Sequence, residues 1–171
     1  MRKVILNLAI SLDGLIEGPK GEFDWCFTDQ DYGMPEFLAG IDTIFYGRKS
    51  YELMVRMGEK AFASNKQYVF SNTLKQVEPG WHLINSDISS KVKEILSQHG
   101  KDIWLFGGTS LVTTFMKEGW IDEYLLSIHP LLLGQGKPLF QDLNERVHLK
   151  LVDTIPYSSG LVQLRYRSLE K

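Results

Sequence analysis

Cysteine is nearly absent from this 171-residue sequence, in which Cys26 is the single example. One thiol cannot form an internal disulfide, so a disulfide-stabilised fold is excluded and a reducing, cytoplasmic location is expected. Long apolar runs are lacking as well, because the opening run meets Asp13 before it is long enough for a signal peptide or a membrane span. We therefore expect no membrane partner.

An excess of charge of one sign is also missing. The sequence has 19 Lys and Arg against 21 Asp and Glu, for a formal net charge of -2. Without a basic field the chain is not expected to bind nucleic acid. The four histidines are scattered without the spacing of metal ligands, so we expect no metal site. Repeats, low-complexity tracts and linkers are absent, which predicts one domain over residues 1–171.

What the sequence does contain is an alternation of apolar strands and helical segments. The predicted helices begin near Pro35, Lys49, Asp87 (as a capping residue) and Gly108. Two further strands, Val147–Ile155 and Leu161–Leu169, follow one another closely and predict an antiparallel hairpin. The earlier predicted strands are Lys3–Ser11, Ile41–Gly47, Gln67–Asn72, Trp81–Ile84, Asp102–Phe106 and Ile121–His129. The pattern predicts an α/β fold of three layers, with a mostly parallel central sheet, flanking helices and an antiparallel C-terminal hairpin.

Two strand ends share one design: a buried strand, then glycine, then cations or hydroxyls at a helix start. They are Gly47-Arg48-Lys49-Ser50 and Gly107-Gly108-Thr109-Ser110. A helix start presents free N–H groups and partial positive charge, and glycine allows close approach, so such a join attracts phosphate. The patterns GxGxxG and GK[ST] are both missing. Arg48 and Lys49 alone are equally consistent with a solvated helix start, but two such joins favour a dinucleotide.

Five segments in order carry a family resemblance: NLAISLDGLIEG (Asn7–Gly18), FYGRKSYE (Phe45–Glu52), VFSNT (Val69–Thr73), WLFGGTSLV (Trp104–Val112) and HPLLLGQGKPLF (His129–Phe140). The sequence resembles the dihydrofolate reductase-like fold family, and most closely the carboxy-terminal reductase domain of riboflavin-biosynthesis enzymes (RibD C-terminal-like). The resemblance covers nearly the whole chain.

The resemblance implies NADPH as the cofactor. Arg48, Lys49 and Ser50, after Gly47, would meet the 2′-phosphate and pyrophosphate, and Ser71 and Asn72 would lie beside the adenosine half. Ala9 and Ile16 would flank the nicotinamide. The family often has a cis peptide bond at the position of Gly107-Gly108. The residues implied at the pyrophosphate are Gly107, Gly108, Thr109, Ser110 and Leu111.

The substrate half departs from the family's patterns. In dihydrofolate reductases an acid helps to protonate the pterin, and by spacing Asp31 matches that acid. Asp29 is an equal candidate. For both residues the alternative is a surface carboxylate beside a turn. Asn65 stands where folate binding needs an arginine, which argues against folate. No basic, hydroxyl-rich cluster for a ribose phosphate is found. The expected substrate contacts are Trp25 in an aromatic loop (with Phe23 and Phe27), Tyr46 and Ser127; the alternative for the aromatic residues is plain core.

These observations predict an NADPH-dependent oxidoreductase that reduces a small heterocyclic, pyrimidine- or pterin-like substrate, resembling 5-amino-6-(5-phosphoribosylamino)uracil reductase. The alternative is a non-catalytic NADPH-binding protein of the same fold, and a true dihydrofolate reductase is a weaker candidate. The apolar run Leu131–Leu133, the C-terminal hairpin and the resemblance together predict a homodimer.

Overall fold

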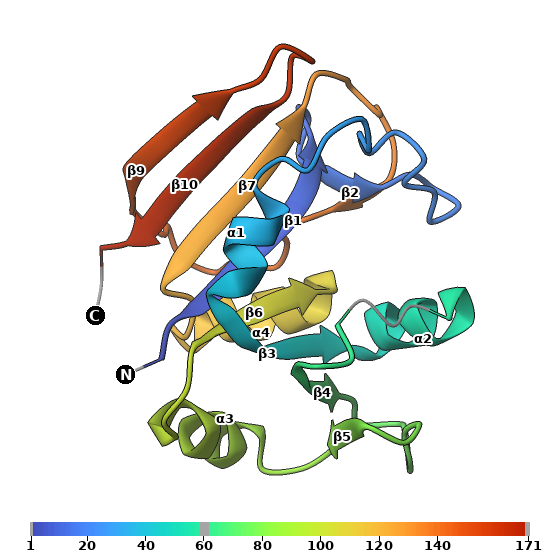
Figure 1. The fold of residues 1–171 in the computed structure, drawn as a ribbon, viewed down its shortest axis with the longest axis vertical. Helices are drawn as coiled ribbons and strands as arrows, with labels where there is room; N and C mark the ends of the chain where they lie inside the picture. Colours follow the sequence, from blue (N-terminus) through green and yellow to red (C-terminus); the bar gives the residue numbers. More distant parts are fainter. Residues whose placement is uncertain (1, 59–61, 170–171) are drawn as a thin grey trace.

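The computed structural model describes residues 2–58 and 62–169, and its centre is an eight-stranded sheet in the order β5-β4-β3-β6-β1-β7-β10-β9 (Figure 1). Strands β5 to β7 in this order are parallel, whereas β10 is antiparallel to β7 and to β9. The strands are β1 (Val4–Ser11), β3 (Ile41–Gly47), β4 (Lys66–Phe70), β5 (Trp81–Ile84), β6 (Asp102–Gly107), β7 (Glu123–His129), β9 (Leu149–Pro156) and β10 (Val162–Ser168).

Helices cover both faces of this sheet, because its central strands are apolar on both sides. On one face, Val92 of α3 (Ile88–Ser97) and Phe115 of α4 (Thr109–Lys117) pack in a core with Phe45. On the other, Phe37 of α1 (Met34–Ala39) and Met54 of α2 (Arg48–Met57) pack in a second core. The predicted three-layer α/β fold with its antiparallel C-terminal hairpin is therefore confirmed.

A second, small sheet was not expected from the sequence. It pairs β2 (Leu15–Glu17) with β8 (Lys137–Pro138) in antiparallel fashion, with Glu17 opposite Lys137. Strands of three and two residues are too short to show a period-2 pattern. This sheet lies beside the carboxyl end of β1, above α2 and α4 in Figure 1.

The structure confirms Asp87 as the capping position of α3, but without a hydrogen bond from its side chain. Its backbone there is left-handed (φ 49°, ψ 41°). An N-cap side chain normally reaches the free N–H groups from an extended backbone, which this residue does not have. Among the described residues, none of the helices combines the length and apolar character needed to cross a bilayer.

Candidate functional site

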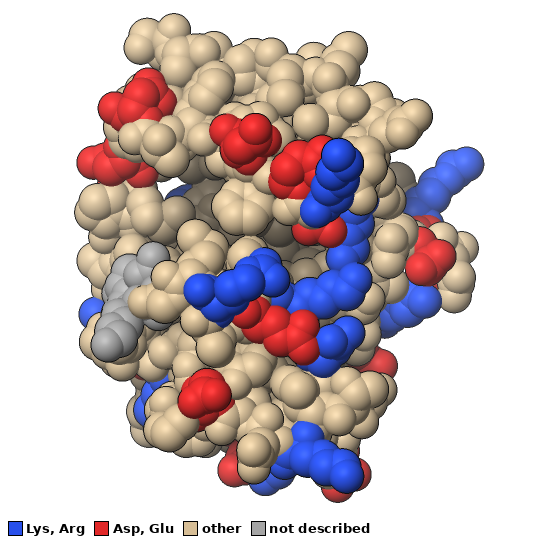
Figure 2. Space-filling view, turned by 90° about the vertical axis from the view of Figure 1, so that its right-hand side faces the viewer, with Lys and Arg blue, Asp and Glu red and all other residues tan. Residues whose placement is uncertain are grey.

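The two glycine-containing joins meet because β3 and β6 are neighbouring parallel strands. Tyr46 is in register with Gly107, so the carboxyl ends of both strands reach the same edge of the sheet. Helix α2 begins at once with Arg48, and α4 begins at Thr109. A cleft of about 480 Å³ opens at this edge. Figure 2 shows a hollow on this side of the molecule, with Lys and Arg side chains gathered around it.

Glycine at position 47 is required by the close approach of the two joins. A Cβ atom there would lie 3.0 Å from the backbone nitrogen of Gly108 and 3.3 Å from the carbonyl oxygen of Gly107. The Gly107-Gly108 peptide bond is cis, as the family resemblance implied, and Gly107 has φ +117°. The absence of a side chain at Gly47 therefore lets the backbones of the two joins lie against each other.

Most of the residues predicted at a cofactor line this cleft. The predicted residues that line it are Gly47, Arg48, Lys49, Ser71, Asn72, Gly108, Thr109, Ser110 and Leu111. Gly107, Ser50, Ala9 and Ile16 are not among the lining residues, although Ser50 Oγ lies 3.6 Å from where a Cβ of Gly108 would stand. The sequence reasoning missed Phe70, Thr73, Ile88, Thr114 and Lys137.

Thr109, the first residue of α4, is a buried polar residue at the wall of the cleft. Its side chain is 1% exposed, and its Oγ1 atom has no hydrogen-bond partner within residues 2–58 and 62–169. A buried hydroxyl without a partner is costly, so such a group at a helix start is suited to a ligand with acceptor oxygens. The position and chemistry of Thr109 thus fit a phosphate group.

Arg48 projects from the start of α2 and already has a carboxylate partner. Its NH1 atom donates to Glu52 Oε1 at 2.8 Å, one helical turn away, and both side chains are more than two-fifths exposed. An exposed pair of this kind contributes little stability. The guanidinium has five N–H donors, so Arg48 can bind a phosphate while keeping or exchanging Glu52.

Ser71 stabilises the part of the cleft that is formed by the turn after β4. Its Oγ atom accepts hydrogen bonds from the backbone amides of Thr73 at 3.2 Å and Leu74 at 3.1 Å. The hydroxyl therefore holds the turn that carries Asn72 and Thr73 to the cleft. The predicted contacts of Ser71 and Asn72 with the adenosine half stay predictions.

The aromatic loop of the substrate half is held by His129 at the end of β7. His129 Nε2 accepts a hydrogen bond from the Phe27 backbone amide at 3.1 Å, and the rings of Trp25 and Phe27 meet the imidazole edge-on at 5.2 and 5.0 Å. Burial lowers the pKa of His129. In the sequence, His129 is one of four scattered histidines and begins the HPLLLGQG segment, and neither feature predicts this anchoring role.

The structure places Tyr46 in the core rather than at the cleft. Its side chain is completely buried, with the rings of Trp81 and Phe106 each 4.9 Å away. The sequence interpretation of Tyr46 as a substrate contact is therefore corrected: the ring packs in the core at the end of β3. Ser127 is half-buried, and its Oγ atom lies 3.4 Å from Gln163 Nε2.

The two candidate acids lie at the loop that leads into α1. Asp31 is exposed, and its carboxylate accepts the Gly33 amide at 2.9 Å. Asp29 accepts the Tyr32 hydroxyl at 2.6 Å, and this hydrogen bond lowers the pKa of Asp29. Both carboxylates stay candidates for the proton source. Asn65 has a structural role, since its Nδ2 donates to the Ile41 carbonyl at 3.1 Å.

Metal ligation has no support in the described residues, in which no group of three or more His, Cys, Asp and Glu side chains is arranged to hold an ion. In the substrate half, Trp25 Nε1 is a buried polar atom that lacks a hydrogen-bond partner within the described part of the chain.

Comparison with known proteins gives close and distant relatives. The chain is 48% identical to the uncharacterized protein YyaP of Bacillus subtilis (strain 168), over 96% of this chain and 94% of that protein. It is 33% identical to the uncharacterized protein YwjB of the same organism, over 96% of this chain and 97% of that protein. Because both relatives are uncharacterized, they assign no activity to this chain.

Solved structures share the fold. A putative riboflavin biosynthesis protein from Shewanella sp. PV-4 has a TM-score of 0.87 at 24% identity, over 99% of this chain and 100% of that one. Dihydrofolate reductase from Enterococcus faecalis, complexed with NADP(H), has a TM-score of 0.74 at 15% identity, over 98% and 97% of the two chains. A diaminohydroxyphosphoribosylaminopyrimidine deaminase/5-amino-6-(5-phosphoribosylamino)uracil reductase from Thermotoga maritima has a TM-score of 0.75 at 16% identity, over 98% of this chain and 56% of that one.

The model of the RibD C-terminal domain family matches residues 2–163. The match covers nearly the whole chain, and both relatives align with it over almost their full length. The chain belongs to the RibD C-terminal domain family.

Proposed function

We propose that the protein is an NADPH-dependent reductase that acts on a conjugated C=N or C=O bond of a small heterocyclic, pyrimidine- or pterin-like substrate. The observation that carries this proposal is the cleft itself. It brings together the cations of Arg48 and Lys49, the start of α4 and the turn after Ser71. The NADP(H) complex of the Enterococcus dihydrofolate reductase, which has the same fold, supports the choice of cofactor.

The residues of the cleft fit the parts of this cofactor. Thr109 Oγ1 and the first N–H groups of α4 suit the pyrophosphate, because they are donors that the helix itself does not use. Arg48 suits the 2′-phosphate, since a guanidinium binds phosphate through paired N–H donors. Gly47 leaves the backbone open between the two phosphate sites. When bound, NADPH supplies the hydride.

A row of side chains crosses the sheet in the proposed substrate half. Ala9 of β1, Ser127 of β7 and Gln163 of β10 are in register, so they lie on one face of the sheet. Gln163 Nε2 lies 3.4 Å from Ser127 Oγ and 3.4 Å from the Tyr32 carbonyl. Ala9 leaves room for a nicotinamide ring, and the polar pair orients a heterocycle against it. Asp31, one residue before Tyr32, is the proposed proton source, with water as the alternative.

Steady-state oxidation of NADPH against a panel of flat heterocycles tests this function. The panel contains dihydrofolate and aminouracils with and without a ribosylamino phosphate group. We expect turnover of at least one heterocycle, with NADPH preferred over NADH, and weak or absent turnover of dihydrofolate. No binding of either nucleotide would overturn the proposal. Efficient dihydrofolate turnover would overturn the substrate class and leave the cofactor in place.

A non-catalytic NADPH-binding protein is the second candidate. It is favoured by the exposure of Asp31, whose carboxylate is engaged by the Gly33 amide. Tight NADPH binding with no oxidation across the panel would support it over the reductase. The cytoplasmic location, the homodimer and the lack of a metal or nucleic-acid partner stay predictions.

A further inference from the structure

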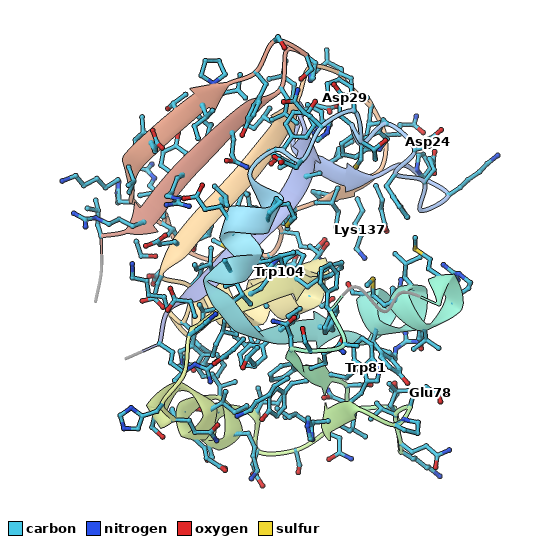
Figure 3. All side chains as sticks on the ribbon, viewed as in Figure 1. Asp24, Asp29, Glu78, Trp81, Trp104 and Lys137 are labelled. Atoms are coloured by element: carbon cyan, nitrogen blue, oxygen red, sulfur yellow. The ribbon has the colours of Figure 1, made fainter. Side chains whose placement is uncertain are left out.

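Lys137 is a cation of the cleft that comes from the opposite wall to Arg48 and Lys49. Among the described residues that line the cleft, it alone belongs to the small β2–β8 sheet. In Figure 3 its side chain extends from this sheet toward the space above α2 and α4. The other lining residues lie at the ends of β3 and β4, in the turn after β4, at Gly108 between β6 and α4, or on α2, α3 and α4.

The backbone on both sides of Lys137 is fixed against the rest of the protein. Lys137 is paired with Glu17, and two residues later the Leu139 amide donates to the Gly14 carbonyl at 3.0 Å. Leu139 is completely buried in the core. On the other side, a Cβ atom at Gly136 would lie 2.1 Å from the Glu17 carbonyl oxygen. The structure thus holds the Cα atom of Lys137 in a set position and leaves its flexible side chain to reach the cleft.

The ammonium group of Lys137 has only a weak anionic partner. Its Nζ atom lies 3.7 Å from Glu17 Oε1, which is too long for a hydrogen bond. The two side chains are 27% and 35% exposed, so water screens their attraction. An ammonium group has three donors. Lys137 can therefore leave Glu17 at little cost when a more highly charged acceptor enters the cleft.

The position of β8 assigns this cation to the α4 side of the cleft. The Thr113 hydroxyl of α4 donates to the Gln141 carbonyl at 3.3 Å, so the chain that follows Lys137 runs along α4. The start of α4, where Thr109 Oγ1 lacks a partner within the described residues, lines the same cleft as Lys137. An anion bound there has N–H and hydroxyl donors on one side and the Lys137 ammonium on the other.

We propose that Lys137 is a cofactor-binding residue that closes the cleft on the pyrophosphate, exchanging Glu17 for a phosphate oxygen. This inference rests on the proposed function. Because the pyrophosphate is common to NADPH and NADH, the contribution of Lys137 is the same for both nucleotides. Arg48, in contrast, discriminates between them through the 2′-phosphate. The two cations thus have separate tasks, and the contact of Lys137 ties the small sheet to α4 whenever nucleotide is bound.

The test measures the dissociation constants of NADPH and NADH by calorimetry for Lys137→Met, Lys137→Arg and Glu17→Gln. Lys91→Met is the matched control, because Lys91 is an exposed lysine of α3, paired with Glu94, outside the cleft. We expect Lys137→Met to weaken both nucleotides by a similar factor of roughly ten to a hundred. Lys137→Arg should keep most of the wild-type affinity. The affinity of Glu17→Gln should equal or exceed that of the wild type, and the affinity of Lys91→Met should equal it.

The salt dependence gives a second readout that a structural role of Lys137 would not move. Loss of one cation–phosphate contact lowers the slope of log affinity against log salt concentration, at unchanged thermal stability. Wild-type binding of both nucleotides by Lys137→Met overturns the inference and leaves the proposed function standing. A loss confined to NADPH also overturns it, since that result places Lys137 on the 2′-phosphate. Failure of the wild type to bind either nucleotide removes the proposed function itself, and this inference with it.

Discussion

The imidazole of His129 accepts a hydrogen bond from the Phe27 amide through Nε2 at 3.1 Å, while its Nδ1 lies 3.0 Å from the Ser127 carbonyl. Only the neutral ring with its proton on Nδ1 satisfies both contacts, since a protonated Nε2 has no lone pair for Phe27. The attachment of the aromatic loop to β7 therefore depends on an uncharged histidine.

Acid should weaken this attachment in a defined pH window. Burial lowers the pKa of His129, whereas an unfolded histidine charges below about pH 6.5. The stabilisation is thus complete above pH 6.5 and is lost as the pH falls toward the folded pKa. We expect the unfolding free energy from denaturant titration to fall through this window. The decrease in unfolding free energy should be smaller in His129→Gln. In His99→Gln, a substitution at an exposed site, the decrease should equal that of the wild type. Equal slopes in all three proteins would contradict the prediction.

Arg48→Ala should weaken NADPH much more than NADH. Only NADPH offers the 2′-phosphate, and loss of a charge-assisted hydrogen bond costs roughly 1.5–3 kcal/mol, or about ten- to a hundredfold in affinity. Calorimetry with both nucleotides measures the ratio. Arg56→Ala is the control, because Arg56 lies in the last turn of the same helix, outside the cleft. An equal loss for both nucleotides would remove the 2′-phosphate role of Arg48.

Gly108→Val should abolish nucleotide binding and leave most of the fold. A Cβ atom at Gly108 has Ser50 Oγ as its nearest neighbour at 3.6 Å, an ordinary contact, so the added bulk enters the cleft and not the backbone. Gly47→Val is the contrasting variant, because its Cβ would meet the Gly108 nitrogen at 3.0 Å. We expect a melting temperature near the wild type for Gly108→Val and a clearly lower one for Gly47→Val. Normal nucleotide binding by Gly108→Val would show that this join has only a structural role.

Cys26 should react slowly with thiol reagents at neutral pH. Burial, with a smaller contribution from the charge of Asp24, raises the pKa of this thiol to about 11. Because the thiolate is the reactive form, the rate of reaction with a disulfide reagent should keep rising with pH beyond 9. A small-molecule thiol measured in parallel serves as the reference. A rate that levels off near pH 8.5 would show an ordinary exposed cysteine.

The wild-type protein should be a homodimer by light scattering, as the sequence predicted. The edge strand β9 presents Leu151 and Val152 at 50% and 52% exposure, and Leu132 of the apolar run is 70% exposed. An unpaired, apolar edge favours self-association. Leu151→Asp should give monomers if β9 forms the contact, and Leu132→Asp should do so if the apolar run forms it. A monomeric wild type at micromolar concentrations would contradict both.

Much of the lining of the cleft was predictable because its residues stand in short contiguous segments at strand-to-helix joins. Gly47-Arg48-Lys49 and Gly108-Thr109-Ser110 carry the information locally, and parallel pairing of β3 and β6 brings them together. Lys137 was not predictable in this way. It reaches the cleft through a two-residue strand whose partner, β2, lies more than a hundred positions earlier in the chain.

The wrong interpretation of Tyr46 has a different cause. Phe45 and Tyr46 are both completely buried, on opposite faces of β3. In a strand covered on both sides, hydrophobicity does not alternate, so the sequence alone does not say which residue faces the cleft. The proposed substrate half combines β1, β7, β10 and the aromatic loop. Its polar pair, Ser127 and Gln163, is brought together only by the pairing of β10 with β7.

Strand β1 lies between β6 and β7, and its two neighbours are made about a hundred residues after it. During synthesis the ribosome therefore releases an apolar strand that cannot be covered until Asp102–His129 has also emerged. Contacts this distant in sequence slow folding and prolong the exposure of unpaired strand edges. At synthesis rates of roughly 5–20 residues per second, the wait lasts about 5–20 seconds. The central position of β1 thus makes the nascent chain dependent on protection from aggregation during this interval.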